Sequence, residues 1–485
     1  MNLLLLFLRL ETKRLWRDRT LPLAFLLMTV FLAVAVQSGR GFVRKERAII
    51  ASAQTEEKTR ILGLKQQIAE LTSGTATQQP SRGSDPRLPS NVGRLGQHWA
   101  VKPPVSVMGT LAAGRNDLYP PCLPVSNRGV ETLFGIGEIE NPQFLLTGRF
   151  DPVFVLVFLF PLFLLALGYN LLSEERENGT LALLRAQSVP LPAVLGAKTT
   201  ARWLLFALPV AVFAPTLLLL AGLFGGDRIT GDTIVRLVLV TVLTACYGAF
   251  WLALCAGVNA LRKDSATNVA TLVGIWLLLT LIVPGALQEG AGVLFPVPSR
   301  IALIEATRKN SMKTTQQGNA LLARYYEDHP ELAEAAQSKT IDPKDFSARR
   351  AAVAKSVEQI VEPLIVRHDT QLRRQQEFTT RFSWLSPVIT FASALEELAG
   401  SGAERQQRFE TQVKRFREQW QEFFLPRVFA RMTISVRDIE SLPRFTFEEE
   451  AEGMVQGRAL GVAFPVVGLT LLLGAAAARL LERRD

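Results

Sequence analysis

The chain has 485 residues, of which 48% are hydrophobic and 20% are charged, and its mean hydropathy is +0.20. Several apolar runs exceed the roughly 18 residues that predict a membrane-spanning helix, which excludes an ordinary soluble protein. The formal net charge of +10 would suit a nucleic-acid-binding protein, but the basic residues flank the apolar runs. Because Lys and Arg concentrate at the cytoplasmic face of membrane proteins, we favour that explanation and expect no nucleic-acid partner.

Residues 1–20 are expected to form a cytoplasmic amphipathic helix on the inner membrane surface, helical over residues 2–17. Arg9, Lys13 and Arg17 are four residues apart and share one helical face. The charges follow the first apolar residues, which is the reverse of the order in a signal peptide. The first span covers residues 21–36, and the positive charge before it places the N-terminus in the cytoplasm.

Residues 37–151 are expected to form a first extracytoplasmic insertion. Its first part, residues 45–71, has an apolar stripe that predicts a helix. Residues 73–91 are rich in Ser, Thr, Gly, Gln and Pro and predict a flexible loop. Residues 102–124 contain five prolines and predict an irregular platform.

Residues 152–288 are expected to hold transmembrane helices two to five, joined by a cytoplasmic coupling loop at residues 173–200. The four spans are Pro152–Leu172, Trp203–Phe224, Thr233–Val258 and Ala266–Leu287. A second extracytoplasmic helical domain follows at residues 289–455, with a helix start signal at Asp342–Pro343 and long helices over 347–382 and 404–424. Residues 456–485 then form the sixth transmembrane helix, about Gly457 to Leu480, and a basic cytoplasmic tail.

Six spans place both chain ends on the same side of the membrane. The basic N-terminus, the pair Arg262–Lys263 and the tail with Arg479, Arg483 and Arg484 all identify that side as cytoplasmic. The expected fold is therefore an all-α polytopic membrane protein. It has six transmembrane helices and a large, mainly helical extracytoplasmic domain built from two insertions, and we expect it in the inner membrane of a bacterial cell.

The most informative short segment follows the second span directly. It contains Glu174, Glu175, Arg176 and Glu177, then Asn178 and Gly179, which break a helix, and Thr180, which can cap the next one at Leu181–Gln187. Acidic residues at a cytoplasmic span end run against the positive-inside tendency, so something should compensate for them. A short helix across the membrane surface, flanked by exposed acids, would suit a soluble docking partner. A solvated turn between two spans is the alternative.

This segment resembles the Glu-Arg-Glu-x-Gly-Thr-Leu element of ABC type-2 permeases. Its surroundings are similar too: Asn141–Pro142, Gly148–Asp151, Leu183–Leu184 and Pro190. The stretches Gly114–Pro120, Ser386–Pro387 and Leu398–Gly402, with Arg405 and Phe409, look like a branch of that family with a large extracytoplasmic domain of unknown function. The resemblance implies two permease subunits and two separate ATPase subunits. Docking residues would be Glu174, Glu175, Arg176, Glu177, Gly179, Thr180 and Leu181, with Leu181–Gln187 as the coupling helix.

The chain itself has no expected ATP site, catalytic residue, metal or cofactor. Gly196–Thr199 looks like part of a phosphate-binding loop but lacks the upstream glycine. The histidines at 98, 329 and 368 are isolated and are interpreted as surface residues. The cysteines at 122, 246 and 255 have no metal-ligand spacing and form no disulfide framework. Asp232 and Arg236 are one helical turn apart and are expected to pair or to reach the membrane interface.

Three hypotheses follow. The favoured one is the permease subunit of an exporter-type ABC transporter, present as a homodimer or paired with a similar permease. A second is ATP-driven mechanotransmission to an extracytoplasmic partner without transport, which the size of both insertions suggests. A third is an extracytoplasmic sensor or membrane-anchored enzyme, which the lack of a visible catalytic constellation disfavours. Substrate, transport direction and dimer symmetry stay open.

Overall fold

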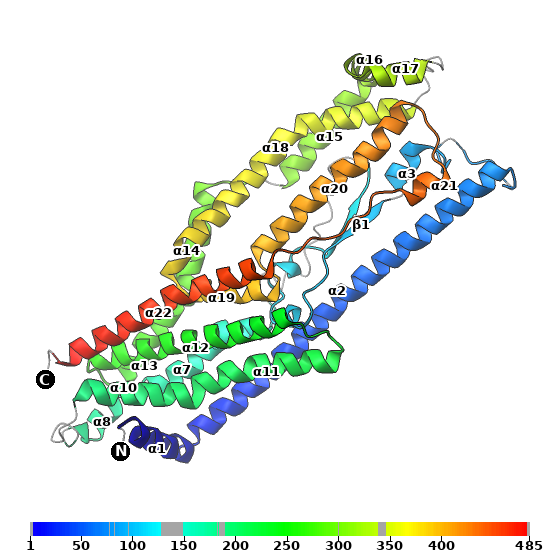
Figure 1. Ribbon diagram of the computed structural model, residues 1–485. Coiled ribbons are helices and arrows are strands. Elements are labelled where there is room, and N and C mark those ends of the chain that lie inside the picture. The colour runs from blue at the N-terminus through cyan, green and yellow to red at the C-terminus, as the bar shows by residue number, and fades with distance from the viewer. Residues whose placement is uncertain are drawn as a thin grey trace.

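The computed structural model describes residues 3–76, 78–81, 83–95, 97–127, 149–181, 183, 190–298, 300–337 and 346–482. A bundle of helices at one end carries a long distal domain at the other (Figure 1). Six helices in the described part of the chain are long and apolar enough to cross a membrane. The fold is therefore an all-α polytopic membrane protein, as expected. The helix α1 and the end of α22 lie at the end of the bundle that also carries α8 (Figure 1).

The bundle contains α1 (Leu3–Arg17) and the six candidate spans. They are α2 (Thr20–Ser73), α6–α8 (Pro152–Phe154, Phe160–Gly168, Ser173–Glu177), α10–α11 (Leu191–Arg202, Leu208–Gly225), α12 (Gly231–Ala260), α13–α14 (Ser265–Leu277, Val283–Leu294) and α22 (Glu452–Glu482). The third span begins twelve residues earlier than the sequence predicts, because α10 continues directly into it. Residues 191–200 therefore belong to a span and not to a loop.

Three of these spans contain a π-helical segment: η3 (Val155–Leu159), η4 (Trp203–Ala207) and η5 (Leu278–Ile282). Each segment ends two residues before a proline, at positions 161, 209 and 284. Proline has no N–H and its ring crowds the carbonyl four residues earlier. A local shift to wider hydrogen bonding lets the helix continue across that point.

The helix α2 is continuous from the first span into the distal domain, although the sequence predicts two separate helices there. Apart from Pro22 in its first turn it contains no proline. The small residue Gly39 lets the helix pack closely against the distal domain, because a Cβ there would collide with the carbonyl oxygen of Thr110. Residues 21–36 are the apolar part of α2, and its second half is rich in charged residues.

The distal domain has two layers beside α2. One holds α3 (Pro89–Leu95), the 3-10 turns η1 (Val107–Thr110) and η2 (Gly114–Asp117), and an antiparallel pair of strands, β1 (His98–Val101) and β2 (Cys122–Val125). The other holds the helices α15 (Arg300–Gln316), α16 (Gly318–Asp328), α17 (Pro330–Gln337), α18 (Phe346–Phe382), α20 (Ala403–Phe429) and α21 (Val436–Glu440). The predicted helix start at Asp342–Pro343 lies outside the described residues.

The helix α19 (Pro387–Ala399) enters the bundle, whereas the sequence analysis places its whole region outside the membrane. It follows the short turn η6 (Ser383–Leu385). The Ser386 hydroxyl donates to the carbonyl of Leu279, in the middle of the fifth span, at 2.7 Å. Phe391 packs on Tyr247, in the middle of α12. The helix α19 is thus a half-length insertion that returns to the distal domain through Gly400.

Candidate functional site

The acidic segment after the second span folds as a five-residue helix, α8, against three neighbouring elements. Asn178 and Gly179 end it, and Gly179 has a φ of +72°, a left-handed conformation that favours glycine. Ser173 is buried, Glu174 and Glu175 are partly buried, and Arg176 to Gly179 are exposed. The segment therefore has an inner side and an outer side, which differ in their contacts.

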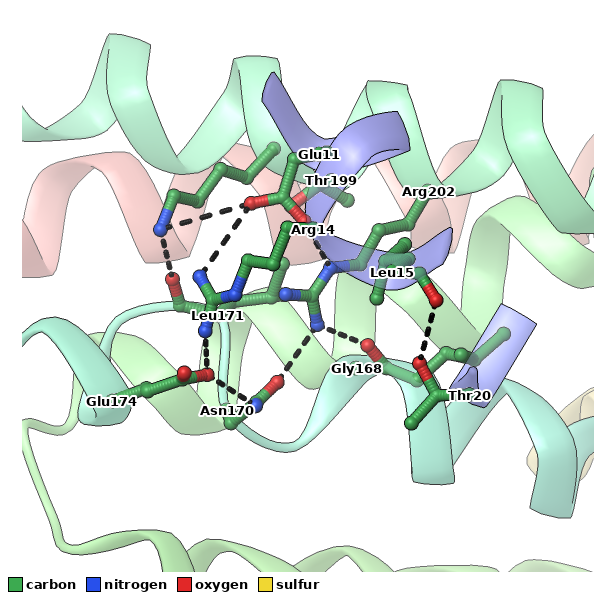
Figure 2. A network of polar contacts seen from close by, with 12 residues as sticks. Glu11, Arg14, Leu15, Thr20, Gly168, Asn170, Leu171, Glu174, Thr199 and Arg202 are labelled. Atoms are coloured by element: carbon green, nitrogen blue, oxygen red, sulfur yellow. Dashed lines mark hydrogen bonds and ion pairs between the residues drawn. The ribbon is translucent and has the colours of Figure 1, made fainter. Parts of the chain in front are cut away.

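The two inner acids are paired within the chain. Arg14 of α1 forms an ion pair with Glu174 (Figure 2). It also lies 3.6 Å from Glu175. The Lys198 ammonium of α10 donates to Glu175 at 2.7 Å. Asn170 Nδ2 donates to Glu174 at 2.6 Å. Arg14 and Lys198 therefore neutralise the acidic charge that runs against the positive-inside tendency, and both belong to the same chain.

A second acid, Glu11 of α1, completes the network from the opposite side. Glu11 is 3% exposed and accepts from the Arg202 guanidinium at 3.2 Å, and Lys198 lies 3.9 Å away (Figure 2). Arg202 is 1% exposed and also donates to Asn170 and to the carbonyl of Leu167. The acids Glu11, Glu174 and Glu175 thus balance the bases Arg14, Lys198 and Arg202. Buried charges are tolerated when they are paired and hydrogen-bonded in this way.

A further group of contacts joins α8 to the turn between α12 and α13. The Ser265 backbone N–H donates to Glu177 at 2.7 Å, and the Ser173 and Ser265 hydroxyls lie 2.8 Å apart. Arg176 donates to the carbonyl of Arg262, which itself has a φ of +61°. Asp264 caps α13, and its hydrogen bonds from the Thr267 hydroxyl and N–H hold the pKa of that carboxyl below its usual range. The segment therefore contacts the turn between α12 and α13 in addition to α1 and α10.

The outer side of the segment offers a small exposed surface. Thr180 donates back to the Glu175 carbonyl at 3.1 Å, and Leu181 packs partly against the bundle. Leu183 is 68% exposed and so offers an apolar side chain at this surface. The remainder of the expected coupling helix Leu181–Gln187 lies outside the described residues, as do Asn141–Pro142 and Gly148.

The other candidates from the sequence have structural roles. Lys198 of the apparent phosphate-binding loop lies within α10 and pairs with acids, so it is not part of such a loop. Asp232 and Arg236 pair at 2.6 Å, as expected. Arg236 also donates to the carbonyl of Leu398 at 3.0 Å, and Gln456 donates to Asp232, so the pair joins α12 to α19 and α22.

Titratable residues of the distal domain form local pairs. His98, His329 and His368 lie beside Glu57, Glu331 and Asp369 respectively. His98 is half buried and accepts from the Phe445 N–H at 3.0 Å, so it is not a surface residue. Among the described residues, no three His, Cys, Asp or Glu side chains form a group that could hold a metal ion.

Sequence reasoning identified the acidic segment but missed its partners. Lys198 and Arg202 are four residues apart on a helix that leads into an apolar run, and Glu11 is one of two acids among the basic residues 9–19. Cations and an acid at such positions can signal a buried pair. The distance of 191 residues between Glu11 and Arg202 hid the pairing.

Comparison with known proteins gives two family matches that overlap at residues 300–312. Residues 143–312 match the family described as CcmB protein, and residues 300–448 match a domain of unknown function, DUF3526. The curated heme exporter protein B of Haemophilus influenzae is 30% identical over 137 residues, which is 28% of this chain. The chain spans 59% of the length of that relative. The first match contains the acidic segment and spans two to five, and the second contains most of the distal helices.

Proposed function

We propose that this chain, an ABC-2-like permease, is the membrane subunit of an exporter driven by a separate ATPase subunit. The observation that carries the proposal is the placement of the acidic segment. It lies at the end of the second span, with an exposed outer side and with contacts to α1, to the third span and to the turn between the fourth and fifth spans. A partner that pushes or pulls this segment would act on most of the bundle at once.

We propose that one group of residues in the acidic segment contacts the ATPase and that a second group positions the segment. Arg176, Glu177, Gly179, Thr180 and Leu181, together with the exposed Leu183, would face the ATPase. Glu174 and Glu175 would position the segment through Arg14 and Lys198. An apolar side chain surrounded by polar ones is a common anchor in protein interfaces.

The remaining features of the assembly follow from this proposal. The α8 end of the bundle would face the cytoplasm of a bacterial cell, with both chain ends on that side and the distal domain outside. In the apolar stretches of the fifth and sixth spans, only 11% and 12% of the residues are buried within the chain. Those faces can meet lipid and a second permease copy or a similar permease. Heme is the first cargo to test, because the name of the relative says that it exports heme.

The test is a docking variant in the complete complex. The chain is purified with its ATPase, and Leu183→Asp is compared with Leu118→Asp, a control leucine of the distal domain that is 46% exposed. We expect Leu183→Asp to lower ATPase recovery and stimulated ATP hydrolysis at least fivefold, a loss of about 1 kcal/mol. The control should retain both. Equal recovery with both variants would contradict docking at this segment.

A second function, mechanotransmission without transport, is supported by α2. This helix has 54 residues, so it extends about 80 Å from the bundle to the far side of the distal domain. Movement of the first span would therefore reach an extracytoplasmic partner. The substitution Gly63→Pro breaks α2 at a site where a Cβ meets nothing within 4 Å. If reconstituted vesicles of the unmodified complex move cargo, mechanotransmission without transport is wrong. If they move none and Gly63→Pro abolishes crosslinking to an outer partner, it is supported. If no cargo moves even in the unmodified complex, the exporter proposal fails.

A further inference from the structure

A hollow in the distal domain lies between α15 and α18 and measures about 350 Å³. Its volume falls in the range of ligand pockets, roughly 300–1,000 Å³. One wall is Thr307, Ser311 and Thr315, which are four residues apart and share one face of α15. The other wall is a face of α18 that extends from Phe346 to Val361, roughly 22 Å along the helix.

One end of this pocket is positively charged. Arg349 and Arg350 line it in the first turn of α18 and lie 5.3 and 5.7 Å from the centre of the Phe346 ring. Neither guanidinium forms an ion pair with any carboxylate among the described residues. Both stand at the N-terminal end of a 37-residue helix, where the helix dipole also favours an anion. The exposed hydroxyl of Thr315 lines the same pocket.

The other end is apolar and carries no net charge. Val353, Val357 and Val361 repeat every four residues and cluster with Ile365. The acid in the lining, Glu358, is neutralised by Arg417 and accepts from Gln421 at 3.2 Å. This end is nearer the bundle, because α15 follows α14 directly and α18 leads through η6 into α19. The charge and the apolar surface are therefore separated along one groove.

We infer that this pocket binds a single-tailed amphiphile with an anionic head. The carboxylate or phosphate of the head would pair with Arg349 and Arg350, which suit planar, bidentate recognition of such groups. The tail would lie on the valine surface, where it leaves water. This inference concerns the distal domain alone and does not depend on the proposed ATPase.

The test uses the full chain in nanodiscs of phosphatidylcholine, without ATPase, titrated with 11-(dansylamino)undecanoic acid. Empty nanodiscs correct for partition of this probe into lipid. We expect saturable binding at one site per chain, and binding of the methyl ester weakened at least tenfold, because the ester has lost its charge. The double variant Arg349→Gln/Arg350→Gln should weaken binding of the acid by about the same factor. Its matched control is Arg373→Gln/Arg374→Gln, an exposed arginine pair further along α18.

A further variant guards against loss of folding. Thr315→Glu adds a negative charge at an exposed position of the wall and should repel the probe without disturbing the packed core. The inference is overturned if the chain shows no saturable binding above empty nanodiscs. Equal affinity for the acid and its ester also overturns it, as does equal weakening by the variant and control arginine pairs.

Discussion

Phe391 of α19 stacks on Tyr247 of α12 with ring centroids 4.0 Å apart and planes 15° from parallel. Tyr247 is fully buried and donates its hydroxyl to the carbonyl of Val157 at 3.0 Å. One aromatic pair therefore links the distal insertion to the fourth span and, through it, to the second span. The pair is the centre of the contact by which α19 is held in the bundle.

Removing Phe391 should loosen this contact. Phe391 is 2% exposed, and truncation of a buried phenylalanine typically costs about 3–5 kcal/mol through lost contacts and an unfilled cavity. We expect Phe391→Ala to lower the thermal midpoint of the purified chain by several degrees. Phe464→Ala is the control, because Phe464 is 77% exposed on α22 and should matter little. Similar midpoints for both variants would show that α19 is not anchored here.

The network around Glu11 should behave as a unit. Glu11→Gln leaves the buried guanidinium of Arg202 without its charged partner, and removal of one partner from a buried pair costs about 3–5 kcal/mol. Adding Arg202→Met removes that unpaired charge, so the double variant should be more stable than Glu11→Gln alone. Denaturation of all variants in one detergent measures the coupling. Glu56→Gln, at an exposed helical pair with Arg60, should change little.

Strict additivity of the two substitutions would contradict the network. Coupled residues in contact usually differ from additivity by about 0.5–3 kcal/mol.

Gly179 should be required for docking more than for stability. Gly179→Val places a branched side chain at a φ of +72°, which costs about 1–2 kcal/mol. Gly226→Val is matched, because Gly226 has a φ of +76° and, like Gly179, open space around its Cβ position. It ends α11 at the distal end of the bundle. Both variants should lose similar stability, but only Gly179→Val should reduce recovery of the ATPase. If Gly226→Val reduces it equally, strain alone explains the effect.

Stability should rise with pH above about 8 because of Lys102. Burial and, after it, the nearby charge of Arg405 lower the pKa of this amine to about 8. Lys102 is 2% exposed and donates to Asn116 at 2.8 Å and to Gln406. The folded chain therefore releases this proton more readily than the unfolded chain. Its contribution to stability is present above pH 10.5 and is lost as the pH falls through 8.

Denaturant unfolding at pH 7.5 and 9.5 measures this effect. The gain has an upper limit of roughly 3 kcal/mol, since each tenfold change in proton affinity is about 1.4 kcal/mol. Lys102→Gln should show a flatter dependence on pH than the unmodified chain. Lys58→Gln, an exposed lysine of α2, should keep it. A slope unchanged by Lys102→Gln would assign the dependence to other groups.

Local patterns in the sequence predict the spans and the long distal helices well. Apolar length and amphipathic spacing can be read from the local sequence alone, without knowledge of distant partners. The helices α12, α18 and α20 therefore begin and end within a few residues of their expected bounds. The continuity of α2 across residues 37–44 was not predicted, and Gly39 within that stretch is required for close packing on Thr110.

Features that depend on distant partners could not be predicted. The helix α19 has only 13 residues, which are too few to span a bilayer. Its apolar face is buried only because α12 and α22 pack against it. The inner and outer sides of α8 differ because Arg14 and Lys198 lie within reach, and neither residue is near Glu174 in sequence. The docking role of the acidic segment itself stays a prediction.

The pairing of Glu11 with Arg202 sets an order on biosynthesis. The helix α1 is made before the third span, and the guanidinium that neutralises its buried acid is synthesised 191 residues after that acid. At roughly 5–20 residues per second, α1 waits about 10–40 s before it can dock. During that interval its acid stays hydrated at the membrane surface. The helix α1 can therefore dock in the bundle only after Arg202 has been synthesised. A chain interrupted before residue 202 would leave α1 undocked and exposed to quality-control proteases.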